Sequence, residues 1–370
     1  MERIFSLFLA FAVIFPLAVP AFAAAKSTVL IDAENRRVLF EENKDERLPM
    51  ASTTKIMTAL LTLEEMELDS PFSVNAAALK VEGSSMGLLP GDTVTLRTLA
   101  YGMLLSSGND AANAAAIRVS GSVPLFVKKM NERAGELGLK NTSFQTPSGL
   151  DADGHYSSAY DLAVLASEAL KNPLFAAICS QSRAKVSFGN PPYERWLSNH
   201  NRLLKTFPGA AGVKTGFTKK AGRCLVSSAE RDGVSLICAT LSCPDDWEVH
   251  TKLYESFFGE LSAVPLEEKI PSLSVPVTGG TKASVSLSAK PVAAAMKKGE
   301  EEKVHVVLST EPFLFAPVEH GTVVGKARFY LGNTFLAETV LTADETVERK
   351  ESPKTLGDQI ADLWMLRDKK

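Results

Sequence analysis

Hydrophobic and polar positions recur with different periods along the chain and divide it into segments of different expected structure. Residues 27–31 and 37–40 are short β-type runs on either side of a polar stretch, a pattern that predicts a hairpin. Residues 52–65 come next, and their apolar side chains are so closely spaced that we expect a helix buried in the interior. The start of the folded chain therefore predicts a hairpin followed by a core helix.

Helical periodicity dominates the middle of the chain, and β-type runs return after it. Because strands and helices do not alternate one by one, we predict an α+β fold in which a helical cluster packs on an antiparallel sheet, rather than a doubly wound parallel sheet. We expect this first domain to cover residues 26–262. Its predicted helices cover residues 96–105, 110–119, 125–137 and 159–170, and its predicted strands cover residues 212–218, 223–229 and 234–241.

The composition changes near residue 264. Three prolines mark a joint, helical periodicity disappears and β-type runs follow, so we predict a small all-β domain over residues 263–350. The prolines are Pro265, Pro271 and Pro276, and the β-type runs cover residues 304–308, 322–330 and 335–341.

The N-terminal residues have the pattern of an export signal. Residues 4–19 form an apolar run behind Arg3, and Ala21 and Ala23 supply the small side chains of a cleavage site, so we expect a signal peptide over residues 1–25. An uncleaved membrane anchor is the alternative. The short apolar run, interrupted by Pro16 and Pro20, argues against it.

The last residues, 351–370, place apolar side chains on one face of a helix and basic residues after it. This pattern favours an amphipathic helix on a membrane surface. Three aspartates weaken attraction to anionic lipid, so packing on the β domain and disorder remain alternatives. The apolar residues are Leu356, Ile360, Leu363 and Trp364, the basic residues are Arg367, Lys369 and Lys370, and the aspartates are Asp358, Asp362 and Asp368.

Composition narrows the classes of partner. The 370 residues are 45% hydrophobic and 22% charged, which suits a full-sized core with a companion domain. The formal net charge of -3 gives no broad basic surface, so we do not expect a nucleic-acid partner. Four cysteines are too few for a disulfide framework and have no metal-ligand spacing. Cys224 and Cys238 lie in neighbouring predicted strands, with buried free thiols as the alternative to a disulfide.

A motif of the form S-x-x-K begins the predicted core helix. Ser52 and Lys55 are three residues apart, so their side chains project from nearly the same helical face. A serine hydroxyl needs a neighbouring base to act as a nucleophile, and a lysine in a dry, cation-rich site loses its proton more readily. We therefore predict that Lys55 takes the proton of Ser52. The alternative is that Ser52 caps the helix and Lys55 is solvated.

Two further motifs supply polar groups for the same chemistry. Ser107 and Asn109 flank a glycine between two predicted helices, where Asn109 is either a helix cap or an amide for the substrate backbone. Lys214, Thr215 and Gly216 lie in a predicted strand. Gly216 leaves room for a peptide to add as a further strand, and Lys214 adds positive charge beside Lys55. An exposed lysine on an edge strand is the alternative.

The order S-x-x-K, S-x-N, K-T-G is specific for penicillin-interacting serine enzymes. The chain resembles the low-molecular-weight penicillin-binding proteins of the D-alanyl-D-alanine carboxypeptidase family, and the resemblance extends over essentially the whole chain after the expected signal. The stretches that carry it cover residues 83–86, 89–92, 107–112, 147–151 and 212–218.

The resemblance implies a role for each motif residue. Ser52 is expected to be the nucleophile, Lys55 the general base, Ser107 a proton relay and Asn109 a group that orients the substrate. Lys214 is expected to assist both acylation and recognition of the substrate carboxylate.

The resemblance also implies an oxyanion hole and a carboxylate site. The backbone N–H groups of Ser52 and Phe217 are expected to form the hole, and the hydroxyls of Thr215 and Thr218 to donate to the terminal carboxylate. Some family members place an arginine after the following strand, but residues 243–250 contain none. The sequence therefore leaves open which residues bind the carboxylate.

The histidines are weaker candidates for the site. His155 lies on a loop that borders the active site in related enzymes and is expected to join its hydrogen bonds, with a structural histidine as the alternative. His200 and His250 have no partner pattern for metal or triad chemistry, so we leave both out of the predicted site.

The implied activity is removal of the terminal D-alanine from peptidoglycan pentapeptides through a Ser52 acyl-enzyme. The expected partners are the stem peptide and β-lactam inhibitors, outside the cytoplasmic membrane, and no metal or organic cofactor is expected. Three alternatives remain. A β-lactamase needs a loop glutamate, whereas Glu168 falls within a helical pattern. A DD-endopeptidase acting on cross-links shares the motifs, and an inactive wall-binding relative is disfavoured by their intact residues.

Overall fold

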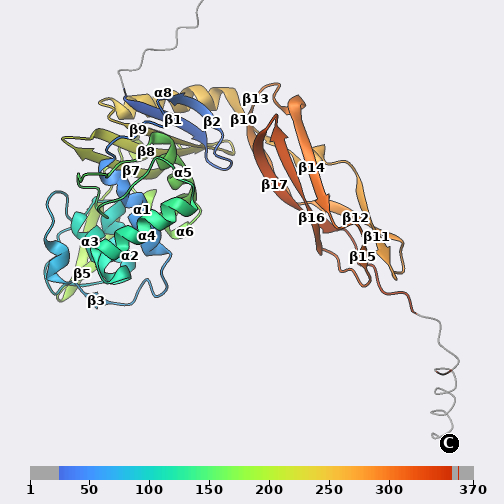
Figure 1. Ribbon diagram of the computed structural model, residues 1–370, viewed down its shortest axis with the longest axis horizontal. Helices are drawn as coiled ribbons and strands as arrows, with labels where there is room; N and C mark the ends of the chain where they lie inside the picture. The colour runs from blue at the N-terminus through green and yellow to red at the C-terminus, as the bar shows by residue number, and fades with distance from the viewer. Residues whose placement is uncertain (1–24, 352–356, 358–370) are drawn as a thin grey trace, which may run out of the picture.

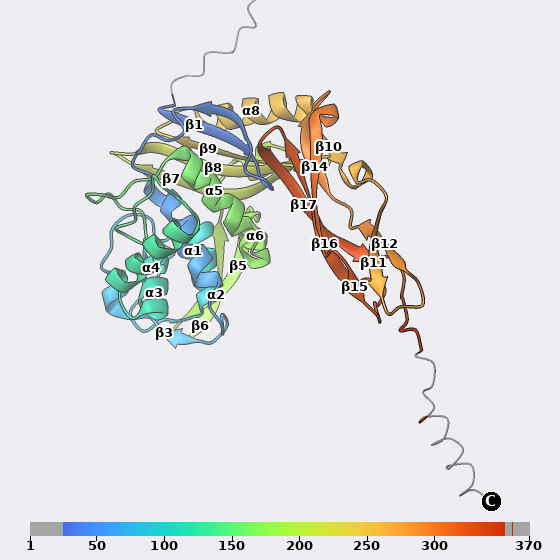
Figure 2. The same ribbon diagram turned by 45° about the vertical axis from the view of Figure 1, so that its right-hand side comes forward.

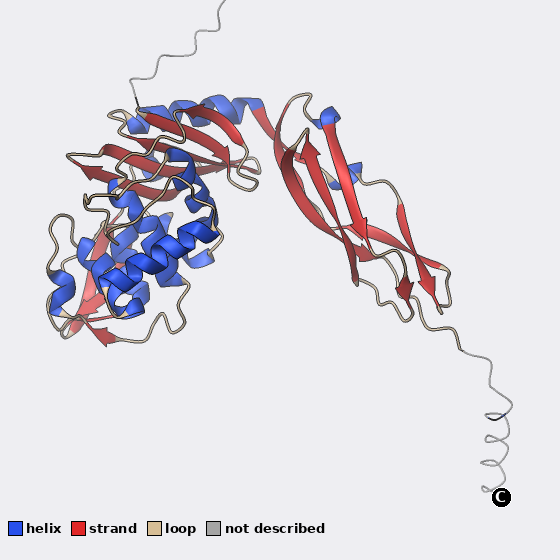
Figure 3. Ribbon diagram, viewed as in Figure 1, coloured by secondary structure: helices blue, strands red, loops and turns tan. Residues whose placement is uncertain are grey.

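The computed structural model describes residues 25–351 and Gly357. The expected export signal and nearly all of the expected C-terminal helix therefore lie outside the described residues. Within them, a body that contains the helices is followed by an elongated body made of strands, as the colouring by secondary structure makes plain (Figures 1 and 3). This is the predicted α+β fold with an added all-β domain.

The first body is built on a five-stranded antiparallel sheet. Its strand order is β2-β1-β9-β8-β7, so the first hairpin and the three later strands meet in one sheet and β7 lies at its edge. All five predicted strands are present within a few residues of the expected bounds. The strands are β1 (Ser27–Asp32), β2 (Val38–Glu42), β7 (Ala210–Thr218), β8 (Gly222–Arg231) and β9 (Val234–Leu241).

Both faces of this sheet are covered by helices. Val29 and Ile31 of β1 pack into the core with the helical cluster, while Leu30 between them packs into a second core with α8. Figures 1 and 2 show α8 on one side of the sheet and the cluster on the other. The helices are α1 (Lys55–Leu63), α2 (Leu96–Leu104), α3 (Asn109–Ser120), α4 (Val123–Glu136), α5 (Ala159–Leu170), α6 (Pro173–Cys179), α7 (Leu203–Thr206) and α8 (Asp246–Glu260).

The sequence prediction differs from the structure at several elements. The expected helix over residues 52–65 begins as a 3-10 turn, η1 (Ala51–Thr54), and becomes α-helical only at Lys55. Helix α8 and a second small sheet were not predicted. That sheet has the order β3-β4-β5-β6, with β3 (Phe72–Ser73), β4 (Thr93–Val94), β5 (Arg183–Gly189) and β6 (Pro192–Ser198), and a further 3-10 turn is η2 (Ala76–Leu79).

The C-terminal all-β domain has a six-stranded sheet of order β14-β16-β17-β12-β11-β15 and a two-stranded pair, β10-β13. Its apolar side chains form two cores of its own. The strands are β10 (Leu261–Pro265), β11 (Leu273–Thr278), β12 (Ser284–Ala289), β13 (Ala293–Lys297), β14 (Val304–Thr310), β15 (Leu314–Phe315), β16 (Val323–Leu331) and β17 (Thr334–Ala343), with 3-10 turns η3 (Glu267–Lys269) and η4 (Glu301–Lys303).

A few polar contacts join the two bodies near the start of β10. Arg37, next to β2, reaches Glu300 through Nη1 at 2.9 Å and the carbonyl oxygen of Ala295 through Nη2 at 2.8 Å. Lys297 of β13 pairs with Glu260 at the end of α8. These contacts hold β13 against the end of the first sheet.

Two general features of the described residues bear on the expectations above. The four cysteines are buried and free, so Cys224 and Cys238 form no disulfide. No single helix in residues 25–351 is long and apolar enough to cross a bilayer. Helices α5 and α6 meet the length and composition criteria only as a pair, across a bend of 111°.

Candidate active site

The S-x-x-K residues meet at the end of the turn that precedes α1. The side chain of Lys55 is fully buried, and its Nζ lies 3.0 Å from Ser52 Oγ, 2.7 Å from Asn109 Oδ1 and 2.5 Å from the carbonyl oxygen of Ser148. Ser52 therefore does not cap a helix, and Lys55 is not solvated. The structural alternatives for both residues are wrong.

The partners of Lys55 also suit a neutral amine. As an ammonium, Lys55 donates to all three oxygens, whereas a neutral amine has two N–H donors and one lone pair. The Asn109 and Ser148 carbonyl oxygens can only accept, so they take both donors and leave the lone pair for the Ser52 hydroxyl. Asn109 is held in this orientation because its Nδ2 donates to the carbonyl oxygen of Glu82 at 2.6 Å.

The environment lowers the proton affinity of both lysines. Burial, followed by the charge of Lys214, holds the pKa of Lys55 well below its usual value, while Asp110 opposes this shift. Burial also lowers the pKa of Lys214 to about 7. The Lys214 Nζ donates to Ser107 Oγ at 3.1 Å and to the carbonyl oxygen of Thr215 at 2.8 Å. Two lysines and two serines thus share one buried polar cluster.

The backbone that presents the two serines is strained. Ala51, just before Ser52, has φ of 48°, and Ser107 itself has φ of 57°, a region that residues with a Cβ rarely occupy. Asn109 begins α3 without capping it, because its side chain is committed to Lys55 and Glu82. The tight connection between α2 and α3 therefore serves the cluster.

The K-T-G strand, β7, lies directly against the turn that carries Ser52. A Cβ added to Gly216 would approach Ser52 N to 3.0 Å and Met50 O to 3.1 Å. Gly216 is therefore needed for close packing of the chain on itself. From the sequence, the glycine was instead expected to allow the close approach of a substrate peptide. The other edge of β7 has no partner strand among the described residues, which leaves an edge to which an extended peptide can add.

A pocket of about 260 Å³ opens over this cluster. Ser52 and Ser107 reach it from the helical side, and Thr215, Gly216 and Phe217 reach it from β7, with Phe217 66% exposed. Lys55, Lys214 and Asn109 are buried and contact these serines or each other. The pocket is lined by Ser52, Ser84, Ser107, His200, Thr215, Gly216, Phe217, Arg223, Cys224, Asp246 and Trp247.

Two predicted site residues, Thr218 and His155, neither line the pocket nor hydrogen-bond to the lysines and serines of the cluster. The Thr218 hydroxyl donates to Asp151 Oδ1 at 3.0 Å and accepts from the Ala221 N–H, so it closes the turn after β7. In this structure the Thr218 hydroxyl is therefore engaged within the chain rather than free, and its role as a donor to the substrate stays a prediction.

His155 hydrogen-bonds to the η1 turn that carries Ser52 and does not line the pocket. Its Nδ1 accepts the Gln145 N–H at 2.9 Å, so Nε2 carries the proton and donates to Thr54 Oγ1, which donates to the carbonyl oxygen of Ala51. Burial lowers the pKa of His155 to about 4. This contact agrees with the structural alternative for His155.

Several residues of the site were missed from the sequence. Ser148 contributes a backbone carbonyl, which has no residue signature. His200 lines the pocket although we left it out, and burial followed by Lys214 lowers its pKa. Arg223 and Asp246 also line the pocket, and they are paired across 23 positions of sequence. The apolar period of Val249, Leu253 and Phe257 would have revealed α8, and with it the place of Asp246.

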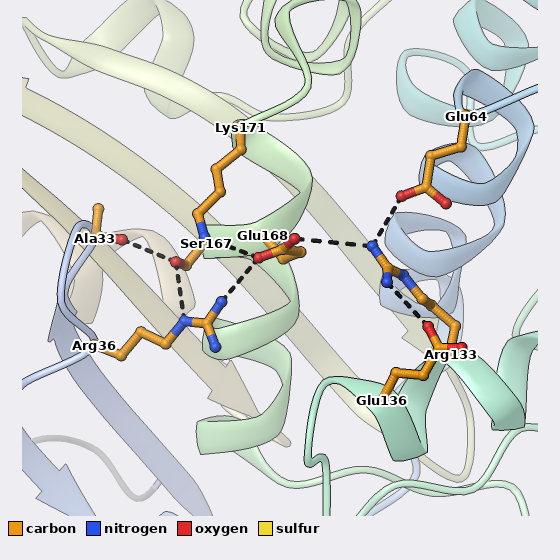
Figure 4. Close-up of polar contacts among 8 residues, drawn as sticks. All are labelled: Ala33, Arg36, Glu64, Arg133, Glu136, Ser167, Glu168 and Lys171. Atoms are coloured by element: carbon orange, nitrogen blue, oxygen red, sulfur yellow. Dashed lines mark hydrogen bonds and ion pairs between the residues drawn. The ribbon is translucent and has the colours of Figure 1, made fainter. Parts of the chain in front are cut away.

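Glu168, the residue weighed as a lactamase-type base, is committed elsewhere. It lies on α5 and pairs with Arg36 and Lys171 at 2.9 Å each, and with Arg133 at 3.8 Å (Figure 4). It does not line the pocket that contains Ser52. Among residues 25–351, no group of three or more His, Cys, Asp or Glu side chains is arranged to hold a metal ion.

Comparison with known proteins agrees with this geometry. A family described as D-alanyl-D-alanine carboxypeptidase matches residues 17–244, and one described as the C-terminal domain of penicillin-binding protein 5 matches residues 267–349. The chain is 36% identical over 336 residues to the D-alanyl-D-alanine carboxypeptidase DacF of Bacillus subtilis, covering 88% of this chain and 86% of that protein.

Further relatives agree in both sequence and structure. DacC of Escherichia coli is 34% identical over 343 residues, covering 88% of this chain and 84% of that protein. The crystal structure of penicillin-binding protein 5 from Haemophilus influenzae matches with a TM-score of 0.68 and 30% identity, over 88% of this chain and 98% of that one. The chain therefore belongs to the D-alanyl-D-alanine carboxypeptidase family of low-molecular-weight penicillin-binding proteins.

Proposed function

We propose that this protein removes the terminal D-alanine of peptidoglycan stem peptides through an acyl-enzyme on Ser52. The observation that carries the proposal is the position of Lys55 Nζ, which lies 3.0 Å from Ser52 Oγ and faces two carbonyl oxygens that can only accept. A neutral Lys55 in this place has its lone pair free for the serine proton.

The reaction follows as two acyl transfers. Ser52 Oγ attacks the carbonyl carbon of the penultimate D-alanine and Lys55 takes its proton. The C–N bond then breaks as Ser107 passes its proton to the leaving amine of the terminal D-alanine and takes one in turn from Lys214. Water then attacks the ester, its proton returns through Ser107 to Lys214, and Lys55 gives its proton back to Ser52 as the truncated peptide leaves. The proposed oxyanion donors are the N–H groups of Ser52 and Phe217, supported by the packing of Gly216 against Ser52 N.

β-Lactams bind at the same serine because their strained amide resembles the D-Ala-D-Ala bond. The ester that a β-lactam forms on Ser52 retains the opened ring, so slow hydrolysis makes the drug an inhibitor. The stem peptide lies outside the cytoplasmic membrane, which supports export by the signal over residues 1–25 as part of the proposal.

We also propose the domain limits expected from the sequence: a catalytic domain over residues 26–262, an all-β domain over 263–350 and a tail over 351–370 that lies on the membrane surface. The family matches at 17–244 and 267–349 support the first two. Deletion of residues 354–370 followed by cell fractionation tests the tail. Unchanged membrane association would reject it as an anchor.

The test of the catalytic proposal is mass spectrometry of the purified protein with benzylpenicillin and, separately, with a peptide ending in D-Ala-D-Ala. We expect an adduct on Ser52 and release of free D-alanine, both abolished in Ser52→Ala. Ser180→Ala is the matched control, because Ser180 is exposed at the end of α6, outside the pocket. A wild-type protein without adduct or D-alanine release would refute catalysis and favour an inactive wall-binding relative.

A further inference from the structure

A carboxypeptidase must bind the free carboxylate at the end of its substrate, and residues 243–250 contain no arginine for this purpose. The pocket nevertheless contains one arginine, Arg223, which comes from β8. Arg223 pairs in register with Phe217 of β7, so its side chain starts beside the strand to which the substrate would add. We propose that Arg223 binds the terminal carboxylate of the substrate and so makes the enzyme an exopeptidase. This inference rests on the proposed function.

The guanidinium of Arg223 is held in place before any substrate arrives. Its Nε and Nη2 both donate to Oδ1 of Asp246, at 3.1 and 2.6 Å, and the guanidinium lies 5.3 Å from the centre of the Trp247 ring. The Asp246 side chain is 2% exposed, whereas that of Arg223 is 40% exposed. The carboxylate of Asp246 therefore lies behind the arginine and fixes its orientation, while one side of the guanidinium faces solvent.

Two donors in the pocket are left without partners. Among the described residues, Arg223 Nη1 and Thr215 Oγ1 make no hydrogen bond, although both residues line the pocket with Ser52. Thr218, by contrast, has its hydroxyl engaged by Asp151 and Ala221. A carboxylate has two oxygens, and a guanidinium edge with an adjacent hydroxyl suits them.

Two basic side chains border this place in the pocket. Asp246 also lines the pocket and offsets the charge of Arg223, but its carboxylate is nearly buried and is committed to Arg223 and to the Trp247 N–H. Lys214 donates to the carbonyl oxygen of Thr215 and, when protonated, adds positive charge next to the pocket. Burial lowers the pKa of Lys214 to about 7, whereas an arginine keeps its charge throughout the working range of pH. Arg223 is thus the permanent cation of the pocket.

The experiment compares one peptide ending in D-Ala-D-Ala with the same peptide as its C-terminal amide, using wild type, Arg223→Gln, Arg223→Lys and Arg231→Gln. Arg231 is a matched control, because it also lies on β8 and pairs with Glu255 of α8, away from the pocket. We expect Arg223→Gln to lower kcat/KM for the free acid by about 10- to 100-fold and to leave that for the amide within about threefold. Arg223→Lys should recover part of the loss.

The readout is the ratio of kcat/KM values for acid and amide, which a merely structural role would leave unchanged. Equal losses on both substrates in Arg223→Gln, or a wild-type enzyme with no preference for the acid, would overturn the proposal. Release of D-alanine and acylation of Ser52 in the wild type test the proposed function separately. If Arg223→Gln does not fold, Arg223→Lys decides the same question. Its ratio of kcat/KM for acid over amide should be lower than that of the wild type, and an unchanged ratio would overturn the proposal.

Discussion

At the scale of single residues, the site depends on matching donors to acceptors around Lys55. Two of its three partners are carbonyl oxygens, so the geometry leaves one direction for a proton from Ser52. The Ser148 carbonyl is held nearby because Gly149, at φ of 86°, passes so close to Ala51 that an added Cβ would lie 2.0 Å from its carbonyl oxygen. Burial keeps water away from the same atoms, which is why the pKa of Lys55 falls.

Loss of the Lys214 charge should shift the pH dependence of acylation. Burial is the first cause of the low pKa of Lys55 and Lys214 is the second, so Lys214→Gln should raise the pKa of Lys55. The base must be neutral to act, so the acidic limb of the acylation profile should move to higher pH. The measurement is the second-order rate of benzylpenicillin acylation between about pH 5 and 9.

Lys214→Arg provides the control for this experiment. It keeps the positive charge while changing the hydrogen bonds to Ser107 and Thr215. The acylation rate of Lys214→Arg should fall, but the acidic limb of its pH profile should stay near that of the wild type. Identical limbs in wild type and Lys214→Gln would show that Lys214 does not control the protonation of Lys55.

At the scale of elements, the active site lies where three separate segments meet. The η1 turn brings Ser52, the junction of α2 and α3 brings Ser107, and the edge strand β7 brings Lys214. The ends of these elements are fixed by packing elsewhere. One example is the group of ion pairs that joins the ends of α1 and α4 to α5 and the β1–β2 turn (Figure 4).

Glu168→Gln should weaken this group of ion pairs without affecting chemistry. Glu168 is 23% exposed and contacts Arg36, Arg133 and Lys171, so we expect the free energy of unfolding to fall by about 1 kcal/mol. Hydrolysis of the benzylpenicilloyl enzyme should stay within about twofold, because Glu168 lies outside the pocket. Denaturant unfolding and deacylation rates are the measurements.

The control for Glu168→Gln is Glu194→Gln. Glu194 pairs with Lys185 on the β5–β6 hairpin and its side chain is 68% exposed, so no measurable loss of stability is expected. A large fall in the deacylation rate of Glu168→Gln would restore the lactamase-type alternative.

At the scale of the whole molecule, the all-β domain is joined to the catalytic body through β10 and a small set of polar contacts (Figure 2). Arg37 makes two of the direct polar contacts, because its side chain is 10% exposed and reaches both Glu300 and the Ala295 carbonyl. Apolar contact comes from Leu261 and Ala263 of β10 and from Ala295 of β13, which pack into the core that contains α8. The orientation of the two bodies thus depends on few side chains.

Arg37→Ala should loosen the all-β domain without changing acylation. It leaves Glu300 without its arginine partner, and loss of such a charge-assisted contact should speed limited proteolysis around residues 261–266 by about tenfold. Ser52 acylation by benzylpenicillin should stay within about twofold of the wild-type rate. Gel electrophoresis of samples from a protease time course measures the cleavage rate. Quenched reactions with benzylpenicillin measure the acylation rate of Ser52.

Arg328→Gln is the matched control, since Arg328 pairs with Glu338 inside the all-β domain. It should leave the rate of cleavage near residues 261–266 unchanged. If Arg37→Ala resisted proteolysis as well as the wild type, the contact with Glu300 would not hold the two bodies together.

Many helices and strands were predicted because the hydrophobic period that marks them lies within the segment itself. The helix at Ala159–Leu170 and the strand at Val234–Leu241 have the bounds expected from periodicity alone. The β5–β6 hairpin was missed although alternating Ala184, Val186 and Phe188 point into the core, so a readable signal was present. The start of α1 was misplaced because the strained Ala51 and the packing of β7 impose a 3-10 turn there.

The sequence by itself determined which reactive side chains are present, their order in three motifs and the broad α+β class, since these depend on residue type and short-range period. Only the tertiary structure decided that the Ser148 carbonyl faces Lys55, that Thr218 is engaged by Asp151, and that the arginine lining the pocket is Arg223 of β8. The physical reason is that backbone carbonyls have no residue signature and that partners across a sheet or turn are set by register and packing between distant segments.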